Sequence, residues 1–184
     1  FIMLSTRIRD SPYKKRLSNL KEGTKVKVRG PEGQFVLHED YSKPAVFLSG
    51  GIGVTPFRSM IKYATDKQLP LKIIMFDSNR NSNNILFKQE FDEWANINKN
   101  LKIIYTINED NHDEHHSSAT NEWKGEFGRI DKDMVLKYVD TNLLNKSIVY
   151  ICGPPGMLKA MKSLMQEELK ISKDMIRIEE FTGY

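Results

Sequence analysis

Three glycines within four residues mark the stretch of this chain best suited to hold a ligand. Gly50, Gly51 and Gly53 follow an apolar run of strand length, and Thr55 and Pro56 come directly after them. Proline suits the first turn of a helix, and threonine can cap the free amides there. Glycines let a ligand approach the backbone, and helix-start amides bind anions. The spacing predicts strand, turn and helix around a phosphate or pyrophosphate; a plain strand-to-helix turn is the alternative.

A second polar group follows the next apolar run. Asp77, Ser78 and Arg80 lie where a dinucleotide-binding sheet reads the adenosine ribose. An acid there favours a free 2′-hydroxyl and an arginine favours a 2′-phosphate, so this stretch carries both signals. A turn with a solvated arginine is the alternative.

The single cysteine ends a third apolar run. Cys152 precedes Gly153, Pro154 and Pro155, at a strand end that should open onto the ligand crevice. A lone cysteine in such a place is more often a small buried hydrophobe than a reactive group. No histidine lies near it in the sequence to activate it as a nucleophile.

Strands and helices alternate from residue 44 to residue 184. Apolar runs predict five strands, over residues 45–49, 71–76, 101–107, 147–152 and 175–181. Amphipathic patterns predict four helices, over residues 55–67, 84–97, 131–139 and 155–169. This alternation is typical of an α/β domain with a doubly wound, five-stranded parallel sheet. Ligands then bind at the carboxyl ends of the strands, where Thr106 also lies.

Residues 1–43 have a different character. They contain ten Lys and Arg against five Asp and Glu, in a chain of net charge +4. Strands are predicted over 2–9, 25–29 and 34–37, with a short helix over 11–20 that begins at Ser11 and Pro12. The helix start beside Lys14 can hold a second phosphate; a charged helix surface is the alternative.

Composition narrows the class of protein. Hydrophobic residues make up 39% of the chain and charged residues 28%, and no apolar run approaches the ~20 residues of a membrane span. One cysteine excludes a disulfide framework, so we expect a cytoplasmic protein without a membrane partner.

The basic stretch, residues 1–43, lacks the interleaved aromatic residues of nucleic-acid binders. Three histidines gather in residues 108–118, which we interpret as a solvated loop without a metal. The first residue is Phe1 and reads as strand, so we expect the sequence to begin inside a larger protein.

Four motifs in order resemble those of the ferredoxin–NADP reductase superfamily. Residues 30–35 match its Gly-Pro-x-Gly-x-Phe element, and residues 50–56 its Gly-Gly-x-Gly-x-Thr-Pro pyrophosphate loop. Residues 152–157 match its Cys-Gly-Pro-Pro-x-Met motif, and the end of the chain resembles its terminal acidic–aromatic segment. The Arg-x-Tyr-Ser/Thr motif that packs on the flavin in this superfamily does not occur in residues 1–43.

The resemblance implies an oxidoreductase that passes hydride from NAD(P)H to a bound flavin, FAD or FMN. Electrons would then pass to an acceptor protein such as ferredoxin or an oxygenase. Residues 1–43 would be the C-terminal part of a flavin-binding β-barrel, and residues 44–184 the NAD(P)-binding domain. The alternative is a dinucleotide-binding module without catalysis, acting in regulation or docking.

The resemblance also implies roles for single residues. Cys152 would lie beside the nicotinamide and shape hydride-transfer geometry, Glu180 would relay a proton at the flavin edge, and Phe181 or Tyr184 would cover the flavin ring. NADP is favoured over NAD through Ser78 and Arg80. The residues expected to bind the nucleotide or the flavin are Tyr13, Lys14, Gly50, Gly51, Gly53, Thr55, Pro56, Ser78, Arg80, Thr106, Cys152, Gly153, Pro154, Pro155, Met157 and Phe181.

Overall fold

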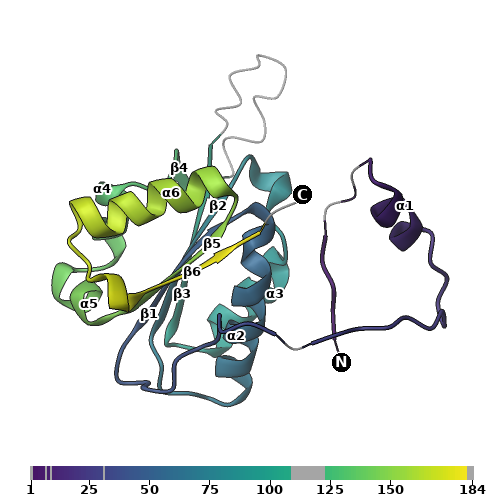
Figure 1. Cartoon of the computed structure of the whole chain (residues 1–184). Helices are drawn as coiled ribbons and strands as arrows, with labels where there is room; N and C mark the ends of the chain where they lie inside the picture. The colour runs from purple at the N-terminus through teal and green to yellow at the C-terminus, as the bar shows by residue number, and fades with distance from the viewer. Residues whose placement is uncertain (1, 7, 9, 31, 109–122, 182–184) are drawn as a thin grey trace.

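A single parallel sheet forms the centre of the molecule in the computed structural model, which describes residues 2–6, 8, 10–30, 32–108 and 123–181 (Figure 1). The strands lie in the order β4-β3-β2-β1-β5-β6. Their bounds are β1 Ala45–Gly50, β2 Ile73–Asn79, β3 Leu101–Ile107, β4 Glu126–Phe127, β5 Ile148–Gly153 and β6 Ile176–Glu180. The predicted doubly wound α/β domain is confirmed. The sixth strand, β4, was not predicted because two residues are too few to show a periodicity.

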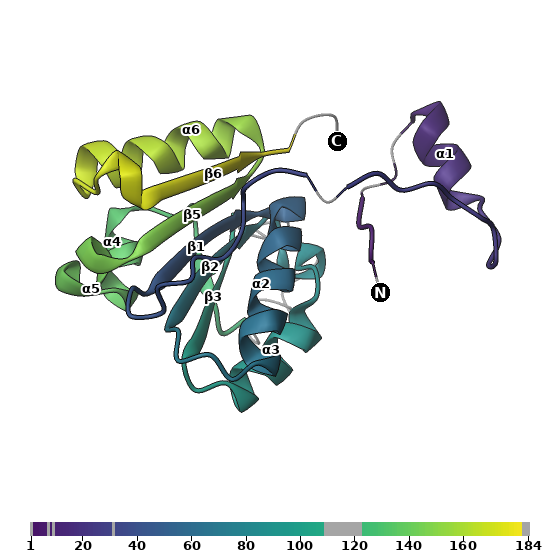
Figure 2. The same ribbon diagram turned by 60° about the horizontal axis from the view of Figure 1, so that its bottom comes forward.

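Helices cover both faces of the sheet. One face packs against α2 (Val54–Asp66) and α3 (Lys88–Ile97), and the other against α4 (Lys132–Tyr138), α5 (Thr141–Lys146) and α6 (Pro155–Ser163) (Figures 1 and 2). Shorter turns are the 3₁₀ segments η1 (Gly51–Gly53), η2 (Ser82–Asn84) and η5 (Lys173–Met175), and a π-helical turn, η4 (Leu164–Glu168). Within the described part of the chain, no helix is both long and apolar enough to cross a membrane.

The two core clusters follow from the two-residue period of the strands. In β1, Ala45 and Phe47 face α2 and α3, whereas Val46 and Leu48 face α4, α5 and α6; all four are fully buried. Because both faces are covered at the centre of the sheet, β1 and β5 are apolar over most of their length, as is β2 as far as Phe76, whereas the edge strand β6 alternates apolar with charged residues. This explains why continuous apolar runs predicted them correctly.

We call residues 2–44 the leading segment; its described residues up to Gly30 lie apart from the sheet, and the chain packs on the sheet from Phe35 onward (Figure 2). Their one helix, α1 (Pro12–Ser18), starts as predicted: the Ser11 hydroxyl accepts the Lys14 amide at 3.2 Å. The strands predicted over 2–9, 25–29 and 34–37 are wrong, because the described residues of these ranges form no strand. A strand needs a neighbour to pair its amides and carbonyls, and none lies beside them among the described residues. Val26 and Val28 are left 62% and 69% exposed.

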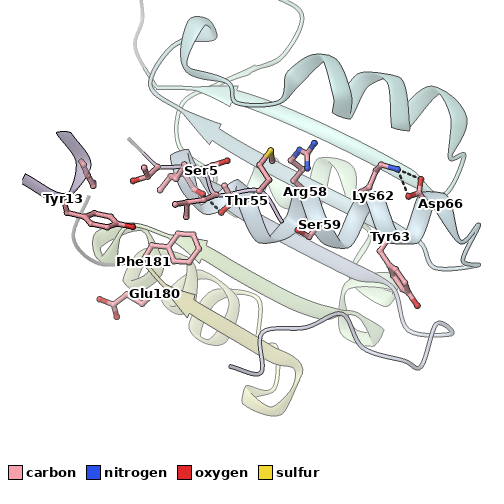
Figure 3. A pocket seen from close by; sticks show the side chains of 15 residues that line it. Ser5, Tyr13, Thr55, Arg58, Ser59, Lys62, Tyr63, Asp66, Glu180 and Phe181 are labelled. Atoms are coloured by element: carbon pink, nitrogen blue, oxygen red, sulfur yellow. Dashed lines mark hydrogen bonds and ion pairs between the residues drawn. The ribbon is translucent and has the colours of Figure 1, made fainter. Parts of the chain in front are cut away.

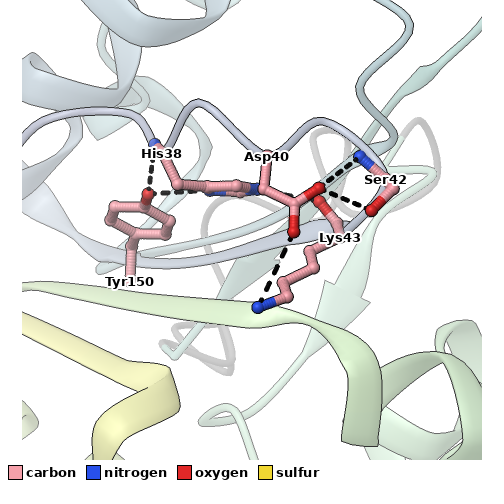
Figure 4. A network of polar contacts seen from close by, with 5 residues as sticks. All are labelled: His38, Asp40, Ser42, Lys43 and Tyr150. Carbon is pink, nitrogen blue, oxygen red and sulfur yellow. Dashed lines mark hydrogen bonds and ion pairs between the residues drawn. The ribbon is translucent and has the colours of Figure 1, made fainter.

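The end of the leading segment is fixed to the sheet by a buried hydrogen-bond network (Figure 4). The Tyr150 hydroxyl lies 2.8 Å from the His38 amide, which donates to it, and 2.9 Å from His38 Nδ1. His38 Nε2 lies 2.8 Å from the Lys43 carbonyl oxygen. A carbonyl only accepts, so Nε2 carries the ring hydrogen and Nδ1 accepts from Tyr150. We call these contacts the His38–Tyr150 latch.

Candidate functional site

The glycine loop connects β1 to α2 through η1. Gly53 is the N-cap of α2 and makes no side-chain capping bond. The prediction that Thr55 caps this helix is wrong, because the 3₁₀ turn runs directly into the α-helix and leaves no extended cap residue before it. The Thr55 hydroxyl instead donates to the Ile52 carbonyl at 3.1 Å, and Pro56 lies in the first turn as predicted.

Backbone packing against the end of β5 requires glycine at position 53, and the Met157 side chain of α6 lies against Gly50. A Cβ on Gly53 would lie 2.2 Å from the Cys152 carbonyl oxygen, and one on Gly50 would lie 2.2 Å from the Met157 sulfur. Gly51 has a φ of 55°, the left-handed conformation that glycine adopts without strain. The glycine loop therefore packs directly on the start of α6. The motifs at residues 50–56 and 152–157 are in contact there.

A cavity of about 460 Å³ lies at the carboxyl edge of the sheet. It brings together the glycine loop, the end of β2 and the start of α6, three stretches that the sequence placed in one site. It is lined by Gly50, Gly51, Ser78, Asn79, Arg80, Asn108, Arg129, Ile130, Pro154, Gly156, Met157, Ala160 and Met161. We call this the arginine cavity.

Part of the lining of the arginine cavity is polar and positively charged. It includes Arg80 and Arg129, together with Asn108, whose amide donates to the Ser78 hydroxyl at 3.3 Å. The strand-end rule placed the loop with Asn108 at this edge of the sheet but did not include Arg129. Arg129 follows Gly128 in a stretch whose residue types indicate backbone geometry and packing rather than ligand binding. Two guanidinium groups that line one cavity suit an anionic ligand.

A second cavity, of about 980 Å³, lies on the other side of the glycine loop, between α2, the end of β6 and the leading segment (Figure 3). Five predicted residues line it, namely Tyr13, Lys14, Thr55, Glu180 and Phe181. Tyr13, Glu180 and Phe181 lie near one end, and Thr55 and Arg58 project from α2. We call this the aromatic cavity. Arg58 was not predicted as a site residue, because its place after the glycine motif is typical of a solvated residue on a helix.

Six of the predicted site residues line neither cavity; these are Gly53, Pro56, Thr106, Cys152, Gly153 and Pro155. The Thr106 hydroxyl donates to the Gly128 carbonyl at 2.6 Å. Cys152 is fully buried, and burial, with the nearby Glu179 charge as a lesser cause, raises the pKa of its thiol to about 12. The thiol is therefore protonated at neutral pH, which agrees with the absence of any activating base in the sequence.

Asp77 does not line the arginine cavity but is buried within β2. It pairs with Ser49 across the β1–β2 ladder, is 1% exposed, and accepts the Asn79 amide at 2.8 Å. Burial raises the pKa of Asp77 to about 6, although Ser49 and Asn79 lower it. Asp77 favours a free ribose 2′-hydroxyl and Arg80 a 2′-phosphate, and of these two residues only Arg80 lines the cavity.

No group of three or more His, Cys, Asp or Glu is placed to hold a metal ion among the residues that the structure describes. The histidine-containing loop lies for the most part outside those residues, as does Tyr184.

A doubly wound parallel sheet with a glycine loop at its carboxyl edge, opening onto a cationic cavity, defines a dinucleotide-binding domain. The comparison with known families is more specific. The model of the family described as the oxidoreductase NAD-binding domain matches residues 47–163, and the chain belongs to this family.

Curated relatives include reductases with different nicotinamide nucleotides. An NADH-cytochrome b5 reductase-like protein of Arabidopsis thaliana is 30% identical over 151 residues, which cover 82% of this chain and 43% of the relative. A nitrate reductase [NADPH] of Emericella nidulans is 31% identical over 163 residues, which cover 81% of this chain and 18% of the relative. The chain thus spans less than half the length of these relatives.

Solved structures share the fold. The CS-b5R domains of human Ncb5or in the NAD⁺ form match with a TM-score of 0.73 and 23% identity, over 92% of this chain and 46% of that one. Ferredoxin-NADP⁺ reductase from Plasmodium falciparum matches with a TM-score of 0.71 and 19% identity, over 93% of this chain and 65% of that one. Together with the family match over residues 47–163 and the reductase relatives, this shared fold confirms the predicted resemblance to the ferredoxin–NADP reductase superfamily.

Proposed function

We propose that this chain binds NADPH in the arginine cavity and passes its reducing equivalents, through a flavin, to an acceptor protein. The observation that carries the proposal is the position of the glycine loop between two cavities. Gly50 and Gly51 line the arginine cavity, while Ile52 and Thr55 line the aromatic cavity. Two redox groups bound on either side of such a loop can approach each other without moving the sheet.

The nucleotide is held by residues of two walls. The backbone amides that begin α2 favour the pyrophosphate, and Gly51 lets it approach closely. Ser78, Arg80 and Arg129 supply charge and hydrogen-bond donors for a 2′-phosphate, and Asp77 does not oppose it from within the cavity. This arrangement favours NADP over NAD.

The residues of the aromatic cavity fit a flavin, FAD or FMN. Tyr13 and Phe181 offer ring surfaces for stacking, and Lys14 offers a cation for a phosphate. A flavin bound there would accept two electrons from a nicotinamide and release them singly. Glu180 holds or releases a proton at the rim, and the buried Cys152 thiol gives the end of β5 its shape. The motif at residues 30–35 supports the proposal that the leading segment belongs to a flavin-binding barrel.

The electron acceptor is proposed at the level of its class. Relatives are named as reductases of cytochrome b5 and of nitrate, and similar structures include a reductase of a cytochrome P450 and a ferredoxin reductase of a dioxygenase. A haem or iron–sulfur protein such as ferredoxin, or an oxygenase, suits this range.

Gly156→Leu tests whether the nucleotide occupies the arginine cavity. Gly156 lines this cavity, and a Cβ there meets nothing within 4 Å, so a leucine enters the cavity without straining the chain. We expect NADPH affinity in calorimetry to fall about tenfold or more, with an unchanged melting temperature. Gly156→Ala is the matched control with a small effect. Wild-type affinity in Gly156→Leu would exclude this cavity.

Arg80→Ala and Arg129→Ala test the preference for NADP. Each should weaken NADPH binding by about ten- to hundredfold, the effect of losing a charge-assisted bond to phosphate, and leave NADH affinity nearly unchanged. Equal losses for both nucleotides would mean that the arginines do not read the 2′-phosphate.

Flavin reduction separates an enzyme from a nucleotide-binding module without catalysis. The chain is mixed with flavin and NADPH, and the flavin absorption band is followed. Bleaching faster than in the same mixture without protein supports the reductase. Nucleotide binding without faster bleaching favours the regulatory or docking module.

A further inference from the structure

Arg58 links the two helices that follow the walls of the arginine cavity. It lies in the second turn of α2, and its Nε and Nη2 atoms both lie 2.6 Å from Glu90 Oε2 on α3. The carbon at the centre of its guanidinium lies 5.0 Å from the centroid of the Phe87 ring and 5.5 Å from that of Trp94. The side chain is only 16% exposed. Every one of these partners belongs to α3 or to the residue that precedes it.

The position of α3 affects the position of Arg80, because the chain runs from Arg80 directly into this helix. The connection passes through η2 and ends at Phe87, the N-cap of α3, which has φ 58° and ψ 21°. This left-handed conformation is unfavourable for a bulky aromatic residue and persists only where the surroundings hold it. Arg58 lies over its ring, and Phe91 packs edge-on against it with ring centroids 6.4 Å apart.

We propose that Arg58 is a positioning residue that fixes the residue 80–87 connection, and with it Arg80, relative to the glycine loop. The inference rests on the proposed function, because the distance between these two walls matters only to a ligand that touches both. A dinucleotide places its pyrophosphate on the glycine loop and its adenosine ribose at Arg80, so it gains from both contacts at once when the walls are preset.

The chemistry of the contact requires arginine. A planar guanidinium stacks on ring surfaces while two of its N–H groups point to one carboxylate. Lysine keeps the charge but has no plane to stack and no fork of donors. Arg58→Lys therefore removes the positioning contact while preserving charge and most of the apolar stem.

The test compares two probes on Arg58→Lys. NADPH touches both walls, whereas adenosine 2′-monophosphate reaches only the wall that carries Arg80. We expect NADPH affinity to fall about tenfold and adenosine 2′-monophosphate affinity to change less than about twofold. Equal losses for both probes would show a general structural defect and overturn the proposal, as would an unchanged NADPH affinity.

Lys88→Met is the matched control, because Lys88 directly follows Phe87 and makes the same kinds of contact. It pairs with Asp92 at 2.5 Å and lies 5.0 Å from the Tyr105 ring centroid, but it does not bridge α3 to α2. NADPH affinity should be unchanged in this variant. A loss as large as that of Arg58→Lys would mean that any cation at the start of α3 matters, against the proposal.

Hydrogen exchange separates failure of this inference from failure of the proposed function. If the wild-type chain does not bind NADPH, the proposed function fails, yet the positioning contact is still testable. Arg58→Lys should speed amide exchange in residues 80–87 and leave β1 and β2 unchanged. Unchanged exchange in residues 80–87 would overturn the proposal whatever the nucleotide does.

Discussion

The buried carboxyl of Asp77 lies among oxygens that together offer few hydrogen atoms, which favours its neutral form. Asp77 Oδ1, Ser49 Oγ and Asn79 Oδ1 are all buried, and none makes a hydrogen bond of ordinary geometry among the described residues, although the Ser49 hydroxyl is near enough to lower the pKa of Asp77. The only hydrogen that these three oxygens offer is that of the Ser49 hydroxyl. A proton on Asp77 adds a second donor, so the neutral acid satisfies the group better than the carboxylate. This agrees with the pKa of about 6 that burial gives Asp77.

Asp77→Asn should stabilise the protein at neutral pH. The pKa of Asp77 rises from 3.8 to about 6, so the folded state binds the proton more tightly, and the carboxylate lowers stability fully above that value. The shift corresponds to about 3 kcal/mol. Urea unfolding should show the variant more stable than wild type at pH 8 by up to this amount, with the difference shrinking towards pH 4. A loss of stability that does not depend on pH would mean that Asp77 is ionised and well paired.

The His38–Tyr150 latch has the opposite pH dependence. Burial, helped by the Arg177 charge, lowers the pKa of His38 below 6.5, while the bond to the Lys43 carbonyl and the Asp40 charge raise it. The folded state therefore prefers neutral His38, and its stabilising effect is complete above pH 6.5 and is lost as the pH falls below that value.

His38→Gln should destabilise the protein by about 1–3 kcal/mol at pH 8, since buried partners lose their hydrogen bonds. The difference in unfolding free energy from wild type should shrink as the pH falls from 7 to 5, because wild-type His38 then resists protonation. Thermal unfolding at several pH values measures it. A constant difference would show that His38 does not change protonation state on unfolding in this range.

At the scale of elements, the glycine loop is held by the strand it packs on. Gly53→Ala should cost about 1–3 kcal/mol, because its Cβ would lie 2.2 Å from the Cys152 backbone, which cannot move as a flexible side chain would. Gly156→Ala is the control, because Gly156 belongs to the adjoining motif at residues 152–157 and a Cβ there meets nothing within 4 Å. Denaturant midpoints compare the two variants. Equal stabilities would mean that η1 shifts freely away from β5.

The sequence predicted those elements whose signal is local. Apolar runs located the parallel strands because both sheet faces are buried, and Ser11 marked the start of α1. β2 runs on to Asn79, past the predicted end at residue 76, because the polar Asp77 is buried in pairing with β1 and β3. The helix predicted from residue 84 begins at Lys88, because Phe87 takes a left-handed conformation that no residue pattern announces.

The site was predictable where glycines and prolines mark it and not where distant segments meet. The glycine loop and the start of α6 were assigned to one site from their strand-end positions. The same rule placed Asn108 there, because it follows the end of β3, whereas Arg129 comes from the entry to α4 and the sequence gives no sign that it reaches the cavity. The role of Arg58 could not be predicted from the sequence, because its contact with Glu90 forms only when α2 packs against α3.

At the scale of the whole molecule, the packed sheet and the leading segment differ in what holds them. The described residues before Gln34 form one seven-residue helix and no strand, and the large apolar side chains Ile2, Leu4, Val26 and Val28 are mostly exposed. From Phe35 onward the chain packs on the sheet, where the Phe35 ring lies edge-on to Tyr150 with centroids 5.6 Å apart. The latch marks the boundary between these two parts.

Limited digestion with a protease that cleaves after glutamate should reveal this boundary. Glu22 and Glu32 are exposed outside any helix or strand, whereas Glu39 lies between His38 and Lys43, which the latch joins by a hydrogen bond. Proteases need locally unfolded backbone, so cleavage after Glu32 should precede cleavage after Glu39. Tyr150→Phe removes the hydroxyl that bonds to His38 and should speed cleavage after Glu39 alone. Mass spectrometry of timed samples identifies each product, and wild-type cleavage after Glu39 as fast as after Glu32 would mean that the latch does not hold the chain.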